Sequence, residues 1–329
     1  MHSMETIFMA TSEPARILIT GAGGQIGTEL TTALRDRHGN DNVVATDIQP
    51  LPHRLAVAGP TERLDVTGRD ALAGLVRKYR INTIYHMAAI LSATGEEKPR
   101  LAWSVNIGGL TNVLEVAREE GVPRIYHPSS IAAFGPETPK DHTPQETVLR
   151  PATMYGITKV SGELLGAYYH RRYGLDVRGI RYPGVISSET PPGGGTTDYA
   201  VAIFYDAILH GRYTCFVRED TVLPMIYMPD CIRATLMLME ADAAGLLHAA
   251  EYNLASLSFS AGELAAEIRK HLPHFEVEYK PDFRQQIADS WPRTIDDSAA
   301  RAEWGWRPEY DLSAMVRDML EKLSARLKS

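Results

Sequence analysis

The first half of the chain alternates between short apolar runs and longer segments in which apolar residues recur with helical spacing. The runs are rich in Ile, Val and Tyr, which is typical of strands in a buried parallel sheet. They lie at residues 16–20, 43–46, 83–87, 124–128 and 177–181. Repeated strand–helix–strand units predict an α/β fold with a doubly wound parallel sheet. Ligands bind such sheets at the carboxyl ends of the strands.

The pattern changes after about residue 185. Loops there separate helices that we expect near residues 198–210, 230–244, 260–271 and 313–328. These segments predict a smaller mixed cap that contributes substrate contacts. The expected division is therefore a larger α/β domain over residues 14–185 and a cap over residues 186–329, from which some segments return to the first domain.

Composition and charge narrow the class of partner. Of 329 residues, 44% are hydrophobic and 23% are charged, and the net charge of -7 comes without any long basic run. These values are ordinary for a globular protein and argue against nucleic acid or an anionic membrane surface as the partner. No apolar run reaches the roughly 18 residues of a transmembrane span. A small molecule is the expected partner.

The first sixteen residues and the two cysteines favour an intracellular protein. The N-terminal segment has no apolar core of a signal peptide, and Glu5 and Glu13 make it a poor transit peptide, so we expect a frayed arm. Cys215 and Cys231 have neither metal-ligand nor redox-motif spacing. We expect both thiols in the core of a protein from a reducing compartment.

A glycine-rich turn follows the first predicted strand. The sequence after Thr20 is GAGGQIG, with glycines at positions 21, 24 and 27, and it leads into a predicted helix. Glycines at this spacing allow a tight turn, close approach of the backbone to a pyrophosphate, and close packing of helix on strand. The helix N-terminus then faces the anion. An unliganded turn has the same glycines, so neighbouring residues must decide between the two.

Asp47 lies twenty positions after Gly27, at the end of the second predicted strand. A carboxylate at this place accepts hydrogen bonds from the ribose hydroxyls of the adenosine and repels a 2′-phosphate. The sequence therefore predicts a Rossmann-type domain that binds NAD rather than NADP. Asp65, in the sequence LDV, is placed either to meet the adenine or to cap a strand end, and both interpretations stay open.

Tyr155 and Lys159 are the candidate catalytic pair. They lie four positions apart in YGITK, so on a helix the phenol and the ammonium point into the same space. An ordinary tyrosine has a pKa of about 10, and a neighbouring ammonium and an oxidised nicotinamide both favour the phenolate. Ser129 and Ser130 follow the strand at 124–128, at the same sheet edge as the glycine turn. A surface Tyr–Lys pair is the alternative, and the convergence of three elements argues against it.

The stretch PPGGGTTDY at residues 191–199 predicts a loop, because two prolines and three glycines continue neither a helix nor a strand. Glycines 193 to 195 provide a hinge, and Thr196 and Thr197 supply hydroxyls that can hold a small charged substrate. Trp291 from the cap is expected to close over the same pocket. The alternative is a plain linker in which Thr197 or Asp198 caps the next helix.

Several stretches resemble the extended short-chain dehydrogenase/reductases. They are GAGGQIG, HMAAI from His86, WSVNIGG around Asn106, SSIAAFG from Ser129, YGITK, and RYPGV from Arg181. Later stretches, TPPGGGTTDYAVAIFYDA, YTCF, LPMIYMPDCIRAT and ADSWP, are similar to the epimerase-like L-threonine 3-dehydrogenases over nearly the whole chain. The resemblance implies NAD-dependent oxidation of the C3 hydroxyl of L-threonine to L-2-amino-3-oxobutanoate, without a metal.

The resemblance also implies a role for each matching residue. Tyr155 is the base, Ser130 holds the developing carbonyl oxygen, and Lys159 binds the nicotinamide ribose. Residues expected at the cofactor are Gly21, Gly24, Gln25, Ile26, Gly27, Asp47, Asp65, Val66, Met87, Ala88, Ala89, Asn106, Tyr155, Lys159, Tyr182 and Pro183. Residues expected at the substrate are Ser92, Ser129, Ser130, Tyr155, Gly195, Thr196, Thr197 and Trp291.

For two of the residues in these stretches we expect a structural role. Asn106 is expected to brace the active-site helix or its water chain, or to be a buried amide that satisfies backbone groups, and His86 is expected to be structural. A homodimer through the helices after Asn106 and Tyr155 is implied, and the compartment is the mitochondrial matrix in a eukaryote or the cytoplasm in a bacterium.

Two other functions stay in view. A sugar-nucleotide 4-epimerase or dehydratase has the same fold, and fold alone does not determine function. Those enzymes usually have Phe-Asn where this chain has Pro183-Gly184, and Arg-Asp before the Tyr-Ile/Val-His run where it has Leu223-Pro224. A non-catalytic NAD-binding regulator is the third hypothesis, and the intact serine, tyrosine and lysine set argues against it.

Overall fold

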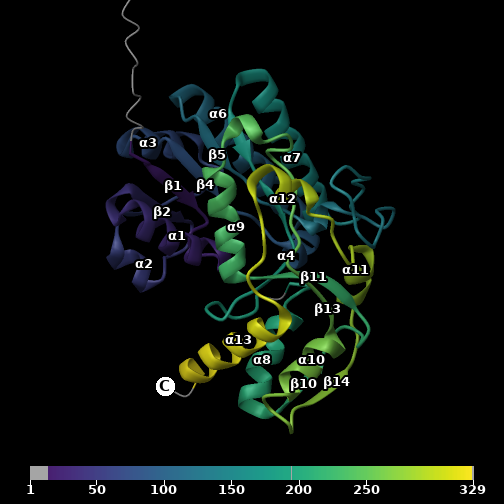
Figure 1. Cartoon of the computed structure of the whole chain (residues 1–329). Helices are drawn as coiled ribbons and strands as arrows, with labels where there is room; N and C mark the ends of the chain where they lie inside the picture. The colour runs from purple at the N-terminus through teal and green to yellow at the C-terminus, as the bar shows by residue number, and fades with distance from the viewer. Residues whose placement is uncertain (1–13, 194, 328–329) are drawn as a thin grey trace, which may run out of the picture.

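The central element is a six-stranded sheet in the order β3-β2-β1-β4-β5-β7, in which every neighbouring pair is parallel. The computed structural model in Figure 1 describes residues 14–193 and 195–327. The strands are β1 (Ile17–Thr20), β2 (Val43–Asp47), β3 (Thr61–Arg63), β4 (Thr83–His86), β5 (Arg124–Tyr126) and β7 (Asp176–Arg178). The predicted α/β fold with a doubly wound parallel sheet is confirmed.

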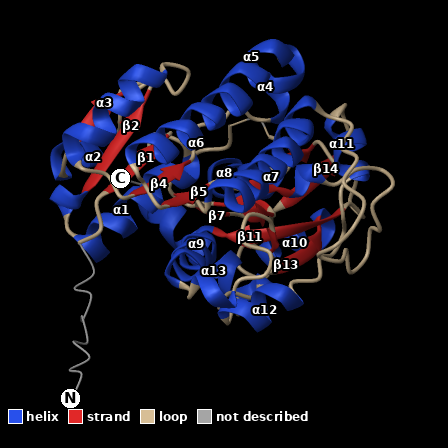
Figure 2. Cartoon of the chain, turned by 90° about the horizontal axis from the view of Figure 1, so that it is seen from above, coloured by secondary structure: helices blue, strands red, loops and turns tan. Residues whose placement is uncertain are grey.

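Helices cover both faces of this sheet because the strands are apolar on both sides. Leu18, Val44 and Ile84 pack on one face with side chains of α3, α6 and α7. Ile19 and Ala45 pack on the other face with α1 and α9, and Figure 2 shows the two layers on opposite sides of the strands. The bounds are α1 (Gln25–His38), α2 (His53–Ala58), α3 (Arg69–Tyr79), α6 (Gly109–Glu120), α7 (Met154–Tyr173) and α9 (Met228–Glu240).

The run at 177–181 is divided between two sheets, unlike the single strand expected there. β7 ends at Arg178, and β8 (Ile180–Tyr182) pairs with β6 (Ser129–Ser130) and β12 (Tyr252–Asn253). Gly179 lies between them, where a Cβ atom would be 2.4 Å from the backbone oxygen of His127. This close approach lets the chain change sheets without leaving the core. It also brings Ser129 and Ser130 beside Tyr182.

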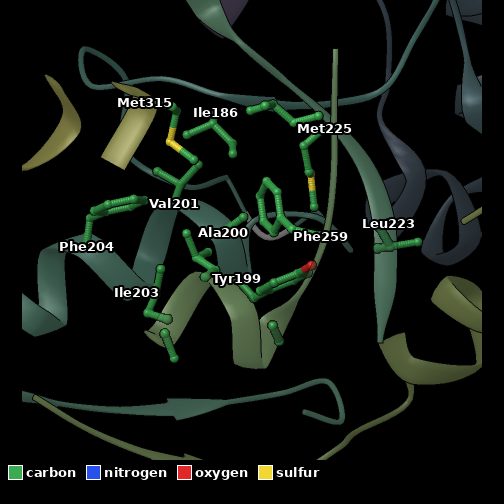
Figure 3. Packing of buried hydrophobic residues seen from close by; sticks show 14 of the residues in the cluster. Ile186, Tyr199, Ala200, Val201, Ile203, Phe204, Leu223, Met225, Phe259 and Met315 are labelled. Atoms are coloured by element: carbon green, nitrogen blue, oxygen red, sulfur yellow. The ribbon is translucent and has the colours of Figure 1, made fainter. Parts of the chain in front are cut away.

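The second half forms its own apolar core below the central sheet in Figure 1. Figure 3 shows Tyr199, Ile203 and Phe204 of α8 against Met225 and Met315. Ile131 and Phe134, which follow Ser130, belong to the same cluster. The elements are β9 (Gly184–Ile186), α8 (Tyr199–His210), β10 (Arg212–Cys215), β11 (Val222–Tyr227), β13 (Leu257–Ser260), α10 (Ala261–Arg269), β14 (Glu276–Tyr279), α11 (Arg284–Ser290) and α13 (Leu312–Leu327).

Parts of the second half pack against the central sheet. α9 and α12 (Ser298–Trp304) belong with Trp306 to the cluster that covers the β1 and β2 face.

Cys215 and Cys231 are buried free thiols, as expected. Among residues 14–193 and 195–327, no helix has both the length and the apolar character needed to cross a bilayer. The domain boundary near residue 185 stays a prediction.

Candidate active site

The turn between β1 and α1 has the geometry of a cradle for an anion. Gly21 has a φ of 68°, and a Cβ atom on it would lie 2.6 Å from the backbone nitrogen of Ala88. A Cβ atom on Gly27 would lie 2.1 Å from the backbone oxygen of Gly21. Both positions therefore require glycine. The first turn of α1 contains no acidic side chain, so its N-terminus is free to face a pyrophosphate.

Asp47 ends β2 and turns back onto this turn. Its Oδ2 accepts a hydrogen bond from the Gly23 nitrogen at 3.0 Å, and its Oδ1 accepts one from the Gln49 nitrogen at 2.9 Å. The carboxylate is therefore held beside the glycine turn, at the place where a ribose would lie. A carboxylate oxygen has a second lone pair for an additional donor.

Asp65 and Val66 have local partners. The Asp65 carboxylate accepts hydrogen bonds from the Thr67 nitrogen at 2.9 Å and from the Thr67 hydroxyl at 2.7 Å, which is the capping interpretation. Val66 is buried, and a Cβ atom on Gly109 would meet it at 2.7 Å. These hydrogen bonds support a capping role for Asp65, and its contact with adenine stays a prediction.

A cavity of about 250 Å³ lies at the carboxyl edge of the sheet, between the two halves of the chain. Most residues expected at the cofactor and all those expected at the substrate line it. They are Gly21, Gly24, Gln25, Ile26, Gly27, Met87, Ala89, Ser92, Ser129, Ser130, Tyr155, Lys159, Tyr182, Pro183, Gly195, Thr196, Thr197 and Trp291. Asp47, Asp65, Val66, Ala88 and Asn106 are not among the lining residues.

Tyr155 and Lys159 project from the first turns of α7 into this cavity. The Thr153 hydroxyl caps the helix by accepting from the Gly156 nitrogen at 3.1 Å. The Lys159 nitrogen lies 5.3 Å from the centroid of the Tyr155 ring and donates to the Pro128 oxygen at 2.7 Å. The two side chains therefore share one space, as their spacing predicts.

Burial opposes the ionisation of Tyr155. Burial raises the pKa of Tyr155 to about 12, and hydrogen bonding with Ser130 only partly opposes this effect. Burial also lowers the pKa of Lys159 to about 8, against the opposing charge of Glu163. Without a bound cation next to the ring, loss of water around the phenol outweighs the effect of the lysine. Tyr155 is thus neutral in the chain alone.

The two serines after β5 have different surroundings. Ser130 Oγ accepts a hydrogen bond from the Ala132 nitrogen at 3.2 Å and faces the cavity. The Ser129 hydroxyl donates to the Glu163 carboxylate, which is buried. The Ser130 hydroxyl therefore lies at the cavity beside the Tyr155 phenol, with which it forms a hydrogen bond. The proton of Ser129 is already held within the protein.

The loop at 191–199 borders the cavity through its second half. Gly195, Thr196 and Thr197 line the cavity, and Thr196 is buried. Asp198 is the N-cap residue of α8, but its side chain makes no capping hydrogen bond. Its Oδ2 instead accepts from the Gly195 nitrogen at 2.8 Å. Gly194 of the expected hinge lies outside the described residues, and the lid hypothesis stays a prediction.

Trp291 is held in the cavity wall by backbone contacts on both sides. The Lys140 ammonium donates to the Ser290 oxygen at 2.5 Å, and the Arg293 nitrogen donates to the Lys140 oxygen at 2.7 Å. Trp291 is 7% exposed. Trp291 therefore lies in the cavity wall, and its closure over a substrate stays a prediction.

Asn106 and His86 lie behind the cavity. The Asn106 amide donates to the Ile90 oxygen and to the Thr158 hydroxyl, both at 3.0 Å, and accepts from the Ile90 nitrogen at 2.8 Å. It thus braces α7, as expected, and does so by satisfying backbone groups. His86 is buried and bonded to the Thr20 hydroxyl at 2.8 Å, and burial lowers its pKa to about 3. This neutral ring fits the structural role.

Residues that the sequence did not single out complete the wall and its support. Leu91, Pro128, Ile131 and Val185 line the cavity, and Glu163 lies behind Ser129. The sequence could have indicated Glu163, because it lies four positions after Lys159 and so on the same face of the predicted helix. Within residues 14–193 and 195–327, no three His, Cys, Asp or Glu side chains are grouped so that they could hold a metal ion.

Comparison with known proteins agrees with this geometry. The model of the NAD dependent epimerase/dehydratase family matches residues 17–255. An uncharacterized epimerase/dehydratase of Staphylococcus haemolyticus is 50% identical over 313 residues, covering 94% of this chain and 98% of that protein.

Solved structures give a second comparison. The L-threonine dehydrogenase of Phytophthora infestans is 52% identical with a TM-score of 0.92, covering 95% of this chain and 100% of that chain. A monomeric L-threonine 3-dehydrogenase from a metagenome is 48% identical with a TM-score of 0.91, covering 95% and 100%. With its parallel sheet, glycine cradle and Tyr155–Lys159 pair, this chain belongs to the NAD dependent epimerase/dehydratase family.

Proposed function

We propose that the protein oxidises the C3 hydroxyl of L-threonine to L-2-amino-3-oxobutanoate with NAD. The main support is the cavity, which is lined by Tyr155, Lys159 and Ser130 together with the loop residues Thr196 and Thr197. The high identity to L-threonine dehydrogenases over 95% of the chain supports the choice of substrate.

The residues around the turn after β1 fit a dinucleotide. The glycines at 21 and 27 leave room that a Cβ atom would fill, and Asp47 is fixed beside them. We propose that the turn holds the pyrophosphate and that Asp47 holds the adenosine ribose. Lys159, Tyr182 and Pro183 would border the nicotinamide end, since they line the cavity.

Proton transfer is the task of Tyr155 and its neighbours. When bound, oxidised NAD supplies an acceptor for the hydride from C3 and a positive charge near the ring. That charge offsets the burial that raises the pKa of Tyr155 to about 12. The Tyr155 phenolate then takes the proton of the C3 hydroxyl, and Ser130 donates to the same oxygen as it becomes a carbonyl. Lys159 in its charged form stabilises the phenolate.

The test of this function is a direct assay of the purified protein. Absorbance of NADH is followed with NAD and a panel that contains L-threonine, L-serine, UDP-glucose and UDP-galactose. The proposal requires NADH formation with L-threonine. Interconversion of the UDP-sugars without net NADH would instead establish the epimerase, and binding of NAD without turnover of any compound would establish the regulator.

Tyr155→Phe should reduce turnover by about 10²- to 10⁴-fold, since a positioned acid/base contributes this much. The affinity for NAD should change little, because the phenol acts on the proton of the substrate. Tyr173→Phe is the matched control, since Tyr173 is an exposed tyrosine of the same helix. Wild-type turnover of the Tyr155 variant would remove the residue from the mechanism.

Asp47→Ala should narrow the preference for NAD over NADP. The variant loses the acceptor for the ribose hydroxyls and the charge that repels a 2′-phosphate, so kcat/KM should fall with NAD and rise with NADP. Asp41→Ala serves as control because Asp41 is exposed and precedes the same strand. An unchanged ratio of the two kcat/KM values would mean that another residue discriminates between the cofactors.

We also propose a homodimer through α7. Ile157, Leu164 and Tyr168 form an exposed apolar stripe on this helix, with Leu164 64% exposed. Sedimentation equilibrium should give twice the chain mass of 36.4 kDa. Leu164→Glu should shift the mass to that of one chain, whereas Leu209→Glu, on an exposed site of α8, should not. A wild-type mass of one chain would contradict the dimer.

A further inference from the structure

A buried ion pair lies directly behind the active-site residues. The side chains of Glu163 on α7 and Arg181 on β8 are 5% and 4% exposed. Arg181 Nε donates to Glu163 Oε1 at 2.9 Å, and Arg181 Nη2 donates to Glu163 Oε2 at 2.8 Å. This paired geometry fixes both planes relative to each other.

On one side, the pair reaches the cavity. The same Oε1 atom of Glu163 accepts the Ser129 hydroxyl. Glu163 also follows Lys159 by one helical turn, and its charge raises the pKa of that lysine, against the larger effect of burial. One carboxylate thus determines where the Ser129 proton points and how readily Lys159 holds its charge.

On the other side, the pair reaches the segment that carries Trp291. Arg181 Nη1 donates to the Gln145 oxygen at 3.0 Å and to Asn253 Oδ1 at 3.1 Å. The Asn253 amide donates to the Thr143 oxygen at 3.2 Å. The Thr143 nitrogen in turn donates to the Thr294 oxygen at 3.1 Å, three residues after Trp291. A continuous chain of hydrogen bonds therefore joins two walls of the cavity.

A buried ion pair of this kind is not required for a stable core. Apolar residues of similar volume often give equal or greater stability, since two charges lose their water on burial. The pair lies between Lys159 and the segment that carries Trp291, and this position suits a role in the active site better than one in stability. We propose that Glu163 and Arg181 are positioning residues that orient Ser129 and maintain the charged form of Lys159 during the reaction.

Several charged and titratable groups surround Lys159, and Glu163 favours its charged form. Tyr155 lies one turn before it on α7, and burial keeps His86 and His127 neutral by lowering the pKa of each ring. Glu251 lies near Glu163, and burial raises its pKa to about 7. The carboxylate of Glu163, one helical turn after Lys159, raises the pKa of this lysine against the larger effect of burial.

The inference rests on the function proposed above, but its main test needs no substrate. Trace acetylation with acetic anhydride at a series of pH values, followed by mass spectrometry, gives the pKa of the Lys159 amine because only the neutral amine reacts. In Glu163→Gln this pKa should fall by about one pH unit or more. In Arg181→Gln it should rise, because the Glu163 charge then lacks its counter-ion. Arg181→Lys should restore it toward the wild-type value.

Asp176→Asn is the matched control. It also removes the carboxylate partner of a fully buried arginine, Arg178, but Asp176 does not contact the cavity residues. Its stability should fall while the Lys159 pKa stays at the wild-type value. Unchanged pKa values in both Glu163→Gln and Arg181→Gln, or shifts in the same direction, would overturn the inference.

Turnover gives a second measurement. With L-threonine, kcat should fall on the order of tenfold to 100-fold in Glu163→Gln, because a displaced reacting group has an effect of this size. KM should change less. If the wild-type protein does not oxidise threonine, the proposed function fails, and the opposite pKa shifts still decide the role of the ion pair.

Discussion

The close contact of α7 with the sheet edge is the constraint on which the site depends. A Cβ atom on Gly156 would lie 2.2 Å from the Ala132 oxygen, and one on Gly162 would lie 2.5 Å from His127 Nε2. The helix therefore packs so closely here that neither glycine position has room for a side chain. This contact removes water from Tyr155 and Lys159 and so moves both pKa values toward the neutral forms. Each ionised form then needs an opposite charge nearby. Glu163 supplies it for the Lys159 ammonium, and we propose that the oxidised cofactor supplies it for the Tyr155 phenolate.

The sequence was sufficient for features that depend on local pattern. Strand periodicity predicted five of the six strands of the central sheet, all except β3, and the glycines at 21 and 27 predicted a turn that admits no side chain. The four-residue spacing of Tyr155 and Lys159 predicted that they share a space, because helix geometry alone requires it. Asp47 was predicted at the glycine turn from its distance along the chain, and its hydrogen bond to the Gly23 nitrogen places it there.

Features that depend on packing between distant segments could not be predicted in this way. The break at Gly179 depends on the approach of the His127 oxygen, which the local sequence does not reveal. The pairing of Glu163 with Arg181 joins a helix to a strand of a different sheet. The burial that raises the pKa of Tyr155 to about 12 could not be predicted, because the sequence shows the neighbouring lysine but not the packing around the phenol. The hydrogen bond by which the Asp198 carboxylate holds the Gly195 nitrogen was not predicted either, since the sequence offered this side chain only as a possible helix cap.

The proposed oxidation of L-threonine at C3 can be tested by tracing the origin of the transferred hydride. L-Threonine with deuterium at C3 is incubated with the protein and NAD, and the NADH formed is analysed by mass spectrometry. We expect one deuterium in each NADH molecule, since the C3 hydrogen leaves as the hydride while Tyr155 removes only the hydroxyl proton. NADH without deuterium, or no NADH at all while a sugar nucleotide is converted, would contradict the central claim.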